Sequence, residues 1–181
     1  LMAGIQKKFI GLLGGSFDPA HIGHLKISKI AIKKIKLKKL YWIITKKNPL
    51  KRKTFFSLNK RIKIAKKITK NTKTIKVLYL DDIVNSSRTI KIIEYILKKE
   101  KLKKLYFVIG SDILCEFHKW KSWKKIVKLT NLVVFSRKGY DKKGRRSTVA
   151  KYLNKNNSTF INNKPIQISS TILKKNIKKL K

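Results

Sequence analysis

Two histidines, His21 and His24, follow a glycine-rich turn near the start of the chain. The turn contains Gly14 and Gly15, and glycines let a backbone approach a phosphate closely because no Cβ stands in the way. A helix that begins just after such a turn offers amide donors and the positive end of its dipole to an anion. Because the two histidines are three positions apart, both rings would leave one face of that helix and reach the same ligand. These residue types at this spacing indicate a phosphate-binding site.

The segments around this turn have the patterns that such a site needs. The apolar run 9–13 before it is short enough for a buried strand, and apolar residues at helical spacing follow over 25–32. Farther along, short apolar runs alternate with helical patterns, which is typical of a parallel sheet with crossover helices. The sequence predicts further strands over 40–44, 75–80, 105–109 and 131–135, and further helices over 58–68, 90–99 and from about 168 towards 180. We therefore expect an α/β fold in which residues 1–181 form a single domain.

Acidic residues follow two of the predicted strands. Gly110 and Asp112 come directly after 105–109, the run with the clearest pattern of a central strand. Open α/β sheets bind ligands at the carboxyl ends of their strands, and a carboxylate there can accept hydrogen bonds from ribose hydroxyls. Asp81 and Asp82 end the third predicted strand, where an ordinary loop position and a role in binding are equally compatible with the sequence.

Hydroxyl residues stand at two predicted helix starts. Residues 85–89 are expected to cap helix 90–99 through their side chains, and Ser169, Ser170 and Thr171 open the terminal helix. Such side chains either cap a helix or bind phosphate oxygens, and the pattern alone leaves both interpretations open.

Aromatic residues gather between Phe117 and Trp123. Trp123 is expected in the core together with Ile126, whereas Trp120, which stands between two lysines, is harder to bury and can stack on a flat heteroaromatic ring. After the fifth predicted strand, the basic stretch 140–147 is predicted to be a mobile surface loop.

The composition is strongly basic, with 48 Lys and Arg against 8 Asp and Glu and a formal net charge of +40. The lysines are spread along the whole chain rather than gathered in one arm, so we expect salt-sensitive attraction to polyanions but no specific nucleic-acid partner. Cys115 is the sole cysteine, which fits a reducing compartment. Because no apolar run approaches membrane-spanning length and the first residues lack a signal-peptide pattern, we expect a cytoplasmic protein without a membrane partner. The oligomeric state stays open.

Two segments resemble a known enzyme family. Residues 14–24 resemble the His-x-Gly-His signature of the nucleotidyltransferase superfamily in its longer Gly-Gly-Ser/Thr-Phe-Asp-Pro-x-His form, although class I aminoacyl-tRNA synthetases share the letters His-Ile-Gly-His. Residues 168–174 are similar to the Ile-Ser-Ser-Thr-x-Ile/Val-Arg signature of bacterial nicotinate-nucleotide adenylyltransferases. This family implies a Rossmann-like, doubly wound parallel sheet with a C-terminal helix. It also implies a reaction, in which ATP and nicotinate mononucleotide give nicotinate adenine dinucleotide and pyrophosphate.

The resemblance implies a role for each matching residue. The ATP-binding residues would be Gly14, Gly15, Ser16, Phe17, His21, His24, Gly110, Asp112, Ser169, Ser170 and Thr171. The residues for nicotinate mononucleotide would be Thr89, Trp120 and Arg137. His21, His24, Lys51 and Lys174 would stabilise the charge that develops on pyrophosphate, and Mg²⁺ would bind through the ATP phosphates rather than through a protein cage.

Two departures from the family pattern and several rivals remain. The late motif ends in Lys174 where the family usually has arginine, and Leu50 stands where many members have a histidine. A class I synthetase would be much longer than this chain. A nicotinamide-mononucleotide adenylyltransferase is the nearest rival, and phosphopantetheine or glycerol-phosphate nucleotidyltransferases share the first motif in a shorter form. A basic RNA-binding protein that keeps the fold is the alternative that is not an enzyme.

Overall fold

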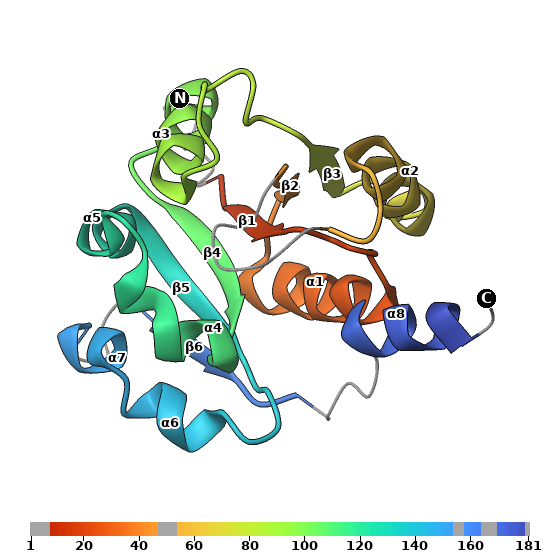
Figure 1. The fold of residues 1–181 in the computed structure, drawn as a ribbon. Helices are drawn as coiled ribbons and strands as arrows, with labels where there is room; N and C mark the ends of the chain where they lie inside the picture. The colour runs from red at the N-terminus through yellow and green to blue at the C-terminus, as the bar shows by residue number, and fades with distance from the viewer. Residues whose placement is uncertain (1–7, 47–53, 154–157, 164–169, 180–181) are drawn as a thin grey trace.

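The computed structural model describes residues 8–46, 54–153, 158–163 and 170–179. Within these ranges, six parallel strands form one sheet in the order β3-β2-β1-β4-β5-β6 (Figure 1). The strands are β1 (Ile10–Gly15), β2 (Lys39–Ile44), β3 (Ile75–Leu78), β4 (Leu105–Gly110), β5 (Thr130–Phe135) and β6 (Ser158–Ile161). The order runs outward in both directions from the β1–β4 pair, so the topological switch point lies at the carboxyl ends of these two strands.

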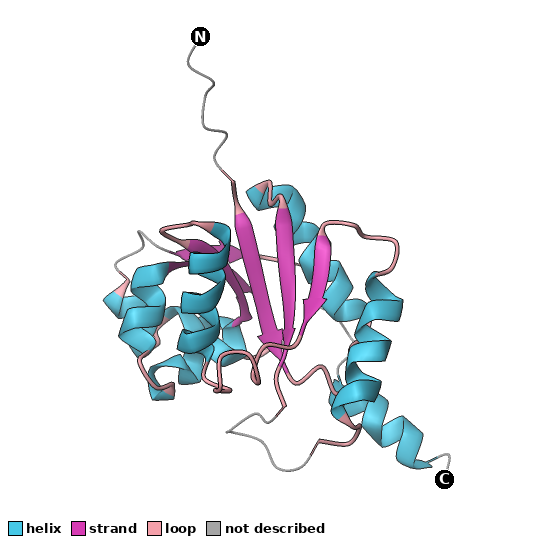
Figure 2. Cartoon of the chain, turned by 90° about the horizontal axis from the view of Figure 1, so that it is seen from above, coloured by secondary structure: helices cyan, strands magenta, loops and turns pink. Residues whose placement is uncertain are grey.

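Helices cover both faces of this sheet (Figure 2). One face carries α1 (Ile22–Ile35) and α2 (Leu58–Thr69). The opposite face carries α3 (Thr89–Glu100), α4 (Ser111–Glu116), α5 (Trp123–Leu129) and α7 (Thr148–Tyr152). The last helix, α8 (Ser170–Lys179), lies beside the start of α1 (Figure 1). No helix within the described segments is both long and apolar enough to cross a lipid bilayer.

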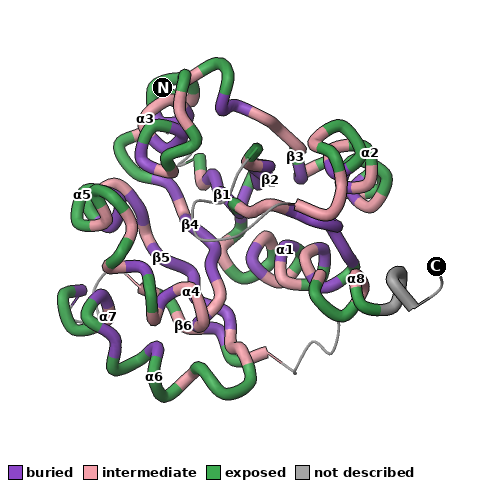
Figure 3. Tube along the Cα trace, viewed as in Figure 1, coloured by how far each residue is buried: buried purple, intermediate pink, exposed green. Residues whose placement is uncertain are grey.

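Alternation along the strands builds a separate core on each face. Leu12 and Phe107 pack with the α3 side, whereas their neighbours Leu13 and Val108 pack with the α1 side. Successive strand side chains point to opposite faces, so a strand buried on both sides is a continuous apolar run. Figure 3 shows the result, with buried strands inside helices whose outer surfaces are exposed.

Every one of the eight acidic residues lies in the described part of the chain and has a polar partner. Glu100, at the end of α3, pairs with Lys8 at 2.6 Å and Lys39 at 2.7 Å, and it accepts a hydrogen bond from the hydroxyl of Tyr41. Burial alone would raise the pKa of Glu100, but these three donors lower it to about 2. At the surface, Glu94 pairs with Lys91 and Lys125, and Glu116 pairs with Lys119. Asp82 accepts a hydrogen bond from the hydroxyl of Tyr79. The remaining four acids lie near the carboxyl ends of the strands.

The α/β class, the parallel sheet and the crossover helices are confirmed. The prediction of a surface loop over 140–147 is wrong, because α6 (Asp141–Arg145) forms there. Its Gly144 is buried so close to Ser111 that a Cβ would lie 3.2 Å from the Ser111 carbonyl oxygen. Strand β6 was not predicted, and its four residues alternate too briefly to produce a recognisable pattern. The expected side-chain cap from residues 85–89 is also absent, because α3 begins after Arg88 without such a hydrogen bond.

Candidate functional site

The two histidines lie where β1 ends and α1 begins, at the switch point of the sheet. Nδ1 of His21 accepts a hydrogen bond from the backbone amide of Gly23 at 3.1 Å. Nδ1 of His24 accepts one from the backbone amide of His21 at 3.2 Å. These reciprocal bonds cap α1, and they hold the two rings with their centroids 3.9 Å apart. The predicted clustering of the two rings is therefore confirmed.

This hydrogen-bond pattern also sets which ring nitrogen carries the proton when each imidazole is neutral. A ring nitrogen that accepts a hydrogen bond carries no proton, so Nε2 holds the proton of each neutral imidazole. Burial, and after it the charge of Arg137, lower the pKa of His21 to about 4. His21 is therefore a neutral hydrogen-bond donor at neutral pH. Neutral donors suit the oxygen atoms of a phosphate without adding a charge to a buried position.

Below the histidines, the glycine turn exposes backbone rather than side chains. Gly14 is exposed and Gly15 and Ser16 are half-buried at the end of β1. Phe17 is only 3% exposed, because its ring packs against Trp42 at 5.0 Å and His24 at 4.8 Å between ring centroids. The ring of Phe17 thus packs against the ring of His24, and the accessible part of the turn consists of residues 14–16.

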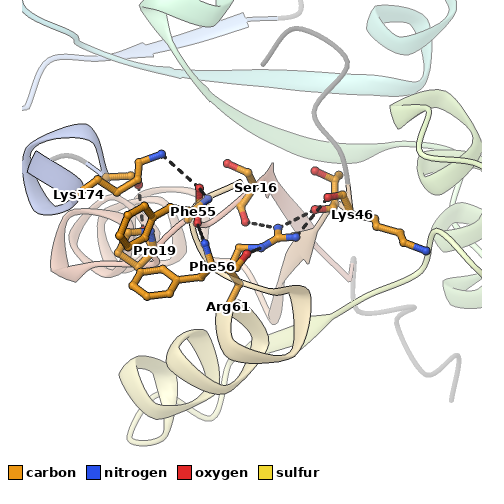
Figure 4. A network of polar contacts seen from close by, with 10 residues as sticks. Ser16, Pro19, Lys46, Phe55, Phe56, Arg61 and Lys174 are labelled. Carbon is orange, nitrogen blue, oxygen red and sulfur yellow. Dashed lines mark hydrogen bonds and ion pairs between the residues drawn. The ribbon is translucent and has the colours of Figure 1, made fainter. Parts of the chain in front are cut away.

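The buried carboxylate of Asp18 connects this turn to residues 55 and 56 and to helix α8, whose contacts Figure 4 shows. It accepts hydrogen bonds from the backbone amides of Phe55 at 2.7 Å and Phe56 at 2.8 Å, and it pairs with the ammonium of Lys174 at 3.2 Å. Burial would raise the pKa of Asp18, but these three donors outweigh it and hold the pKa below its usual range. The hydroxyl of Ser170 donates to the carbonyl of Pro19 at 2.9 Å. Helix α8 is therefore fixed to the histidine loop by two contacts.

The ends of β4 and β5 form a second group of polar residues. Asp141 accepts hydrogen bonds from the hydroxyl of Ser111 at 2.7 Å and from the backbone amide of Arg137 at 3.1 Å. Asp112 lies 3.8 Å from Nε of Arg137, and its Oδ1 is buried without a hydrogen bond. Because β4 lies between β1 and β5 in the parallel sheet, the residues that follow β4 and β5 lie at the same edge as the histidine loop. The structure thus brings the predicted residues of 110–112 and 137 together with the histidines.

The two other predicted substrate residues lie on the opposite side of the sheet. Thr89 is the first residue of α3 and is half-buried. Trp120 is half-buried too, because its ring packs against Phe117 at 4.9 Å and Phe107 at 6.3 Å. Trp123 is also half-buried, beside the buried Ile126.

A cavity of about 250 Å³ lies near the start of α3, lined by Lys46, Tyr79 and residues of the 81–87 turn. Asp81 accepts a hydrogen bond from the amide of Lys46 at 2.9 Å, which ties the end of β2 to the turn after β3.

Sequence reasoning did not single out two buried or half-buried carboxylates that hold the loops of this site, Asp18 and Asp141. A buried charged side chain is unusual, and the scarcity of acids was the one signal that could have drawn attention to Asp18 and Asp141. Lys51 and Ser169 lie outside the described residues. Thr171 is exposed on the first turn of α8, next to Ser170.

No group of three or more metal-binding side chains occurs within the described segments. The donors of the site are imidazole N–H groups, hydroxyls, backbone amides and cationic side chains. This set fits the oxygen atoms of phosphates.

Comparisons with known proteins agree with this geometry. A family model described as cytidylyltransferase-like matches residues 12–176. A relative from Pelagibacter ubique, named as a probable nicotinate-nucleotide adenylyltransferase, is 48% identical over 170 residues, which cover 94% of this chain and 94% of the relative. One of the same name from Ruegeria sp. is 34% identical over 142 residues, which cover 78% of this chain and 75% of the relative.

Solved structures share the fold. The nicotinic acid mononucleotide adenylyltransferase of Plasmodium falciparum complexed with NaAD superposes with a TM-score of 0.75, at 19% identity over 93% of this chain and 83% of that one. That identity is too low to carry more than the fold. The family model that matches residues 12–176 and the 48% identity to the Pelagibacter relative show that the chain belongs to the nicotinate-nucleotide adenylyltransferase family of cytidylyltransferase-like proteins.

Proposed function

We propose that this chain transfers the adenylyl group of ATP to nicotinate mononucleotide, which gives nicotinate adenine dinucleotide and pyrophosphate in NAD biosynthesis. The single observation that supports this best is the pair of backbone-fixed histidines above the glycine turn, at the switch point of the sheet. Family membership supplies the substrate class. The free thiol of Cys115 supports a cytoplasmic setting for the reaction.

The reaction needs no protein nucleophile. The 5′-phosphate of nicotinate mononucleotide attacks the α-phosphorus of ATP, a new oxygen–phosphorus bond forms, and the bond to the β-phosphate oxygen breaks as pyrophosphate leaves. Both reacting groups are anionic, so the protein has to align them and stabilise the transferred charge. Nε2–H of His21 and His24 would donate to phosphate oxygens as that charge moves.

The remaining residues hold the two nucleotides. Residues 14–16, with Ser169, Ser170 and Thr171, would bind the phosphates, assisted by Lys51 and Lys174. Gly110 and Asp112 would bind the ribose of ATP. The half-buried position of Asp112 just after β4 supports this role, because a carboxylate at the carboxyl end of a parallel strand can accept hydrogen bonds from ribose hydroxyls. Thr89, Trp120 and Arg137 would contact the nicotinate nucleotide. Mg²⁺, carried by the ATP phosphates, neutralises part of their charge when it is bound.

Pyrophosphate release with ATP and Mg²⁺ tests this function. Nicotinate mononucleotide, nicotinamide mononucleotide and phosphopantetheine are compared at equal concentrations. We expect strong preference for nicotinate mononucleotide, whereas preference for the amide would reassign the acceptor. No release with any acceptor from folded protein would exclude the enzyme.

His24→Ala tests the histidine pair in the same assay. Removal of one oxyanion donor commonly costs about 100- to 1,000-fold in kcat, and we expect a loss of this order. Circular dichroism checks that the variant is folded. Turnover like that of the wild type would remove His24 from the mechanism.

A further inference from the structure

Arg61, on the first turn of α2, is a cation that is only 1% exposed (Figure 4). Its guanidinium donates hydrogen bonds to carbonyl oxygens from three separate segments. Nη1 donates to Ser16 at 2.7 Å and to Thr45 at 2.8 Å. Nη2 donates to Lys46 at 3.2 Å, and Nε donates to Phe56 at 3.2 Å.

Three of these four carbonyls, those of Ser16, Thr45 and Lys46, follow β1 and β2 directly. Ser16 lies in the glycine turn, and the next residue, Phe17, has a φ of 44°, in the left-handed region. Thr45 and Lys46 directly follow β2. One planar group with a fixed fork of donors therefore connects the loop after β1 to the loop after β2.

The burial of this charge costs hydration free energy, which a side chain that only fills space in the core would not need to lose. Among the described residues, no carboxylate lies within ion-pair distance of the guanidinium. The carboxylates of Asp18 and Asp81 stabilise the charge of Arg61 only from beyond that distance, so the guanidinium gains less than it would in an ion pair, yet it loses the same hydration. What the arrangement provides is geometry, since five donors in one plane fix the relative positions of several carbonyls.

The peptide that joins Thr45 to Lys46 shows how tightly this geometry is defined. Its carbonyl, that of Thr45, accepts a hydrogen bond from Arg61 at 2.8 Å, and its amide, that of Lys46, donates to Asp81 at 2.9 Å. The peptide is thus held from both sides, at the border of the cavity near the start of α3. The loop after β1 contains residues 14–16, which would bind the ATP phosphates under the proposed function.

We propose that Arg61 is a positioning residue for adenylyl transfer, which fixes the loop after β1 relative to the loop after β2 and so aligns the attacking phosphate with the α-phosphorus of ATP. This inference rests on the proposed function. Arg61 acts through backbone carbonyls and touches neither nucleotide. Its loss should therefore slow the transfer step more than it weakens the binding of ATP alone.

Arg61→Lys and Arg61→Gln test the proposal. Lysine keeps the charge without the planar fork, and glutamine keeps two donors without the charge. A misalignment of about 1 Å can cost about 100-fold in rate, so we expect kcat to fall by roughly that factor in both variants. The affinity for ATP alone, measured by calorimetry, should stay within about threefold of the wild type, which is less than 1 kcal/mol.

Glu100→Gln is the matched control for a loss of stability. It breaks a buried ion-pair cluster at the amino ends of β1 and β2, far from the loops that Arg61 joins. All variants are assayed at a temperature at which circular dichroism shows them to be folded. We expect Glu100→Gln to lose stability but to keep its kcat.

Three results would overturn the proposal. They are an unchanged kcat in both Arg61 variants, an equal loss of kcat in Glu100→Gln, and a loss of ATP affinity as large as the loss of kcat. The turnover of the wild type distinguishes a failure of this proposal from a failure of the proposed function. If the wild type itself releases no pyrophosphate, the proposed function fails before the Arg61 variants are compared.

Discussion

At the scale of single residues, His21 connects the site to stability through its protonation. His21 is 6% exposed, and burial lowers its pKa in the folded protein to about 4, below the usual 6.5 of a solvated histidine. Between pH 6.5 and pH 4 the unfolded chain therefore binds a proton that the folded chain does not bind. Stability rises with pH wherever the unfolded state holds more protons, so acidification across this window should destabilise the fold.

Urea unfolding as a function of pH measures this effect. The contribution of His21 should fall by on the order of 3 kcal/mol between pH 6.5 and pH 4. His21→Asn is the control variant, because asparagine caps helices well and does not titrate. The wild type should lose more stability than this variant across the window. Parallel curves for the two proteins would contradict a depressed pKa.

Gly14 offers a separate test of where the ligand lies. A Cβ at this position would meet its nearest neighbour at 3.6 Å, an ordinary contact, so Gly14→Ala should fold with a stability within about 1 kcal/mol of the wild type. If phosphate approaches this exposed backbone, the methyl group displaces it, and kcat/KM for ATP should fall by about 100-fold. Thermal unfolding and steady-state kinetics together check this prediction. Normal kinetics would place the phosphates elsewhere.

At the scale of elements, α8 depends on Asp18. The ammonium of Lys174 and the hydroxyl of Ser170 are its described polar contacts with the histidine loop. We expect Asp18→Asn and Lys174→Met each to loosen α8 and to increase hydrogen exchange of its amides. Because the two side chains are direct partners, the double variant should be less destabilised than the sum of the single variants, by about 1–2 kcal/mol. Strict additivity would mean that the ion pair does not hold the helix.

The elements that could be predicted from sequence are those whose pattern is local. β4 and β5 are continuous apolar runs, and the histidine spacing is sufficient to place both rings on one helix end. The short elements α6 and β6 escaped prediction because tertiary contacts stabilise them, such as the bond from Ser111 to Asp141. Arg61 was missed for the same reason, since a helical arginine normally faces solvent and its four carbonyl partners lie 5 to 45 residues away in the sequence.

At the scale of the whole molecule, a net charge of +40 in 181 residues opposes compaction. Salt screens this repulsion, because the Debye length falls from about 30 Å at 0.01 M to about 3 Å at 1 M ionic strength. We expect the unfolding temperature to rise by a few degrees over this range, equivalent to about 1 kcal/mol. Sucrose in place of salt is the control for non-ionic stabilisation. A fall in the unfolding temperature with salt would show that local ion pairs outweigh the overall repulsion.

The eight carboxylates, each of which has a partner, restrict how this protein can be re-engineered. Each of its acidic side chains already has a polar partner. Glu100 forms ion pairs, and Asp18 and Asp141 accept hydrogen bonds that hold loops in place. An engineer who wants a less basic protein, for crystallisation or for weaker adhesion to nucleic acid, can therefore work only on the lysines. Exposed ones on the outer side of α1 and α2, such as Lys29 and Lys63, are open to replacement by glutamate. Exposed lysines without an ion-pair role are therefore the positions to change, and the carboxylates mark the positions that must be left alone.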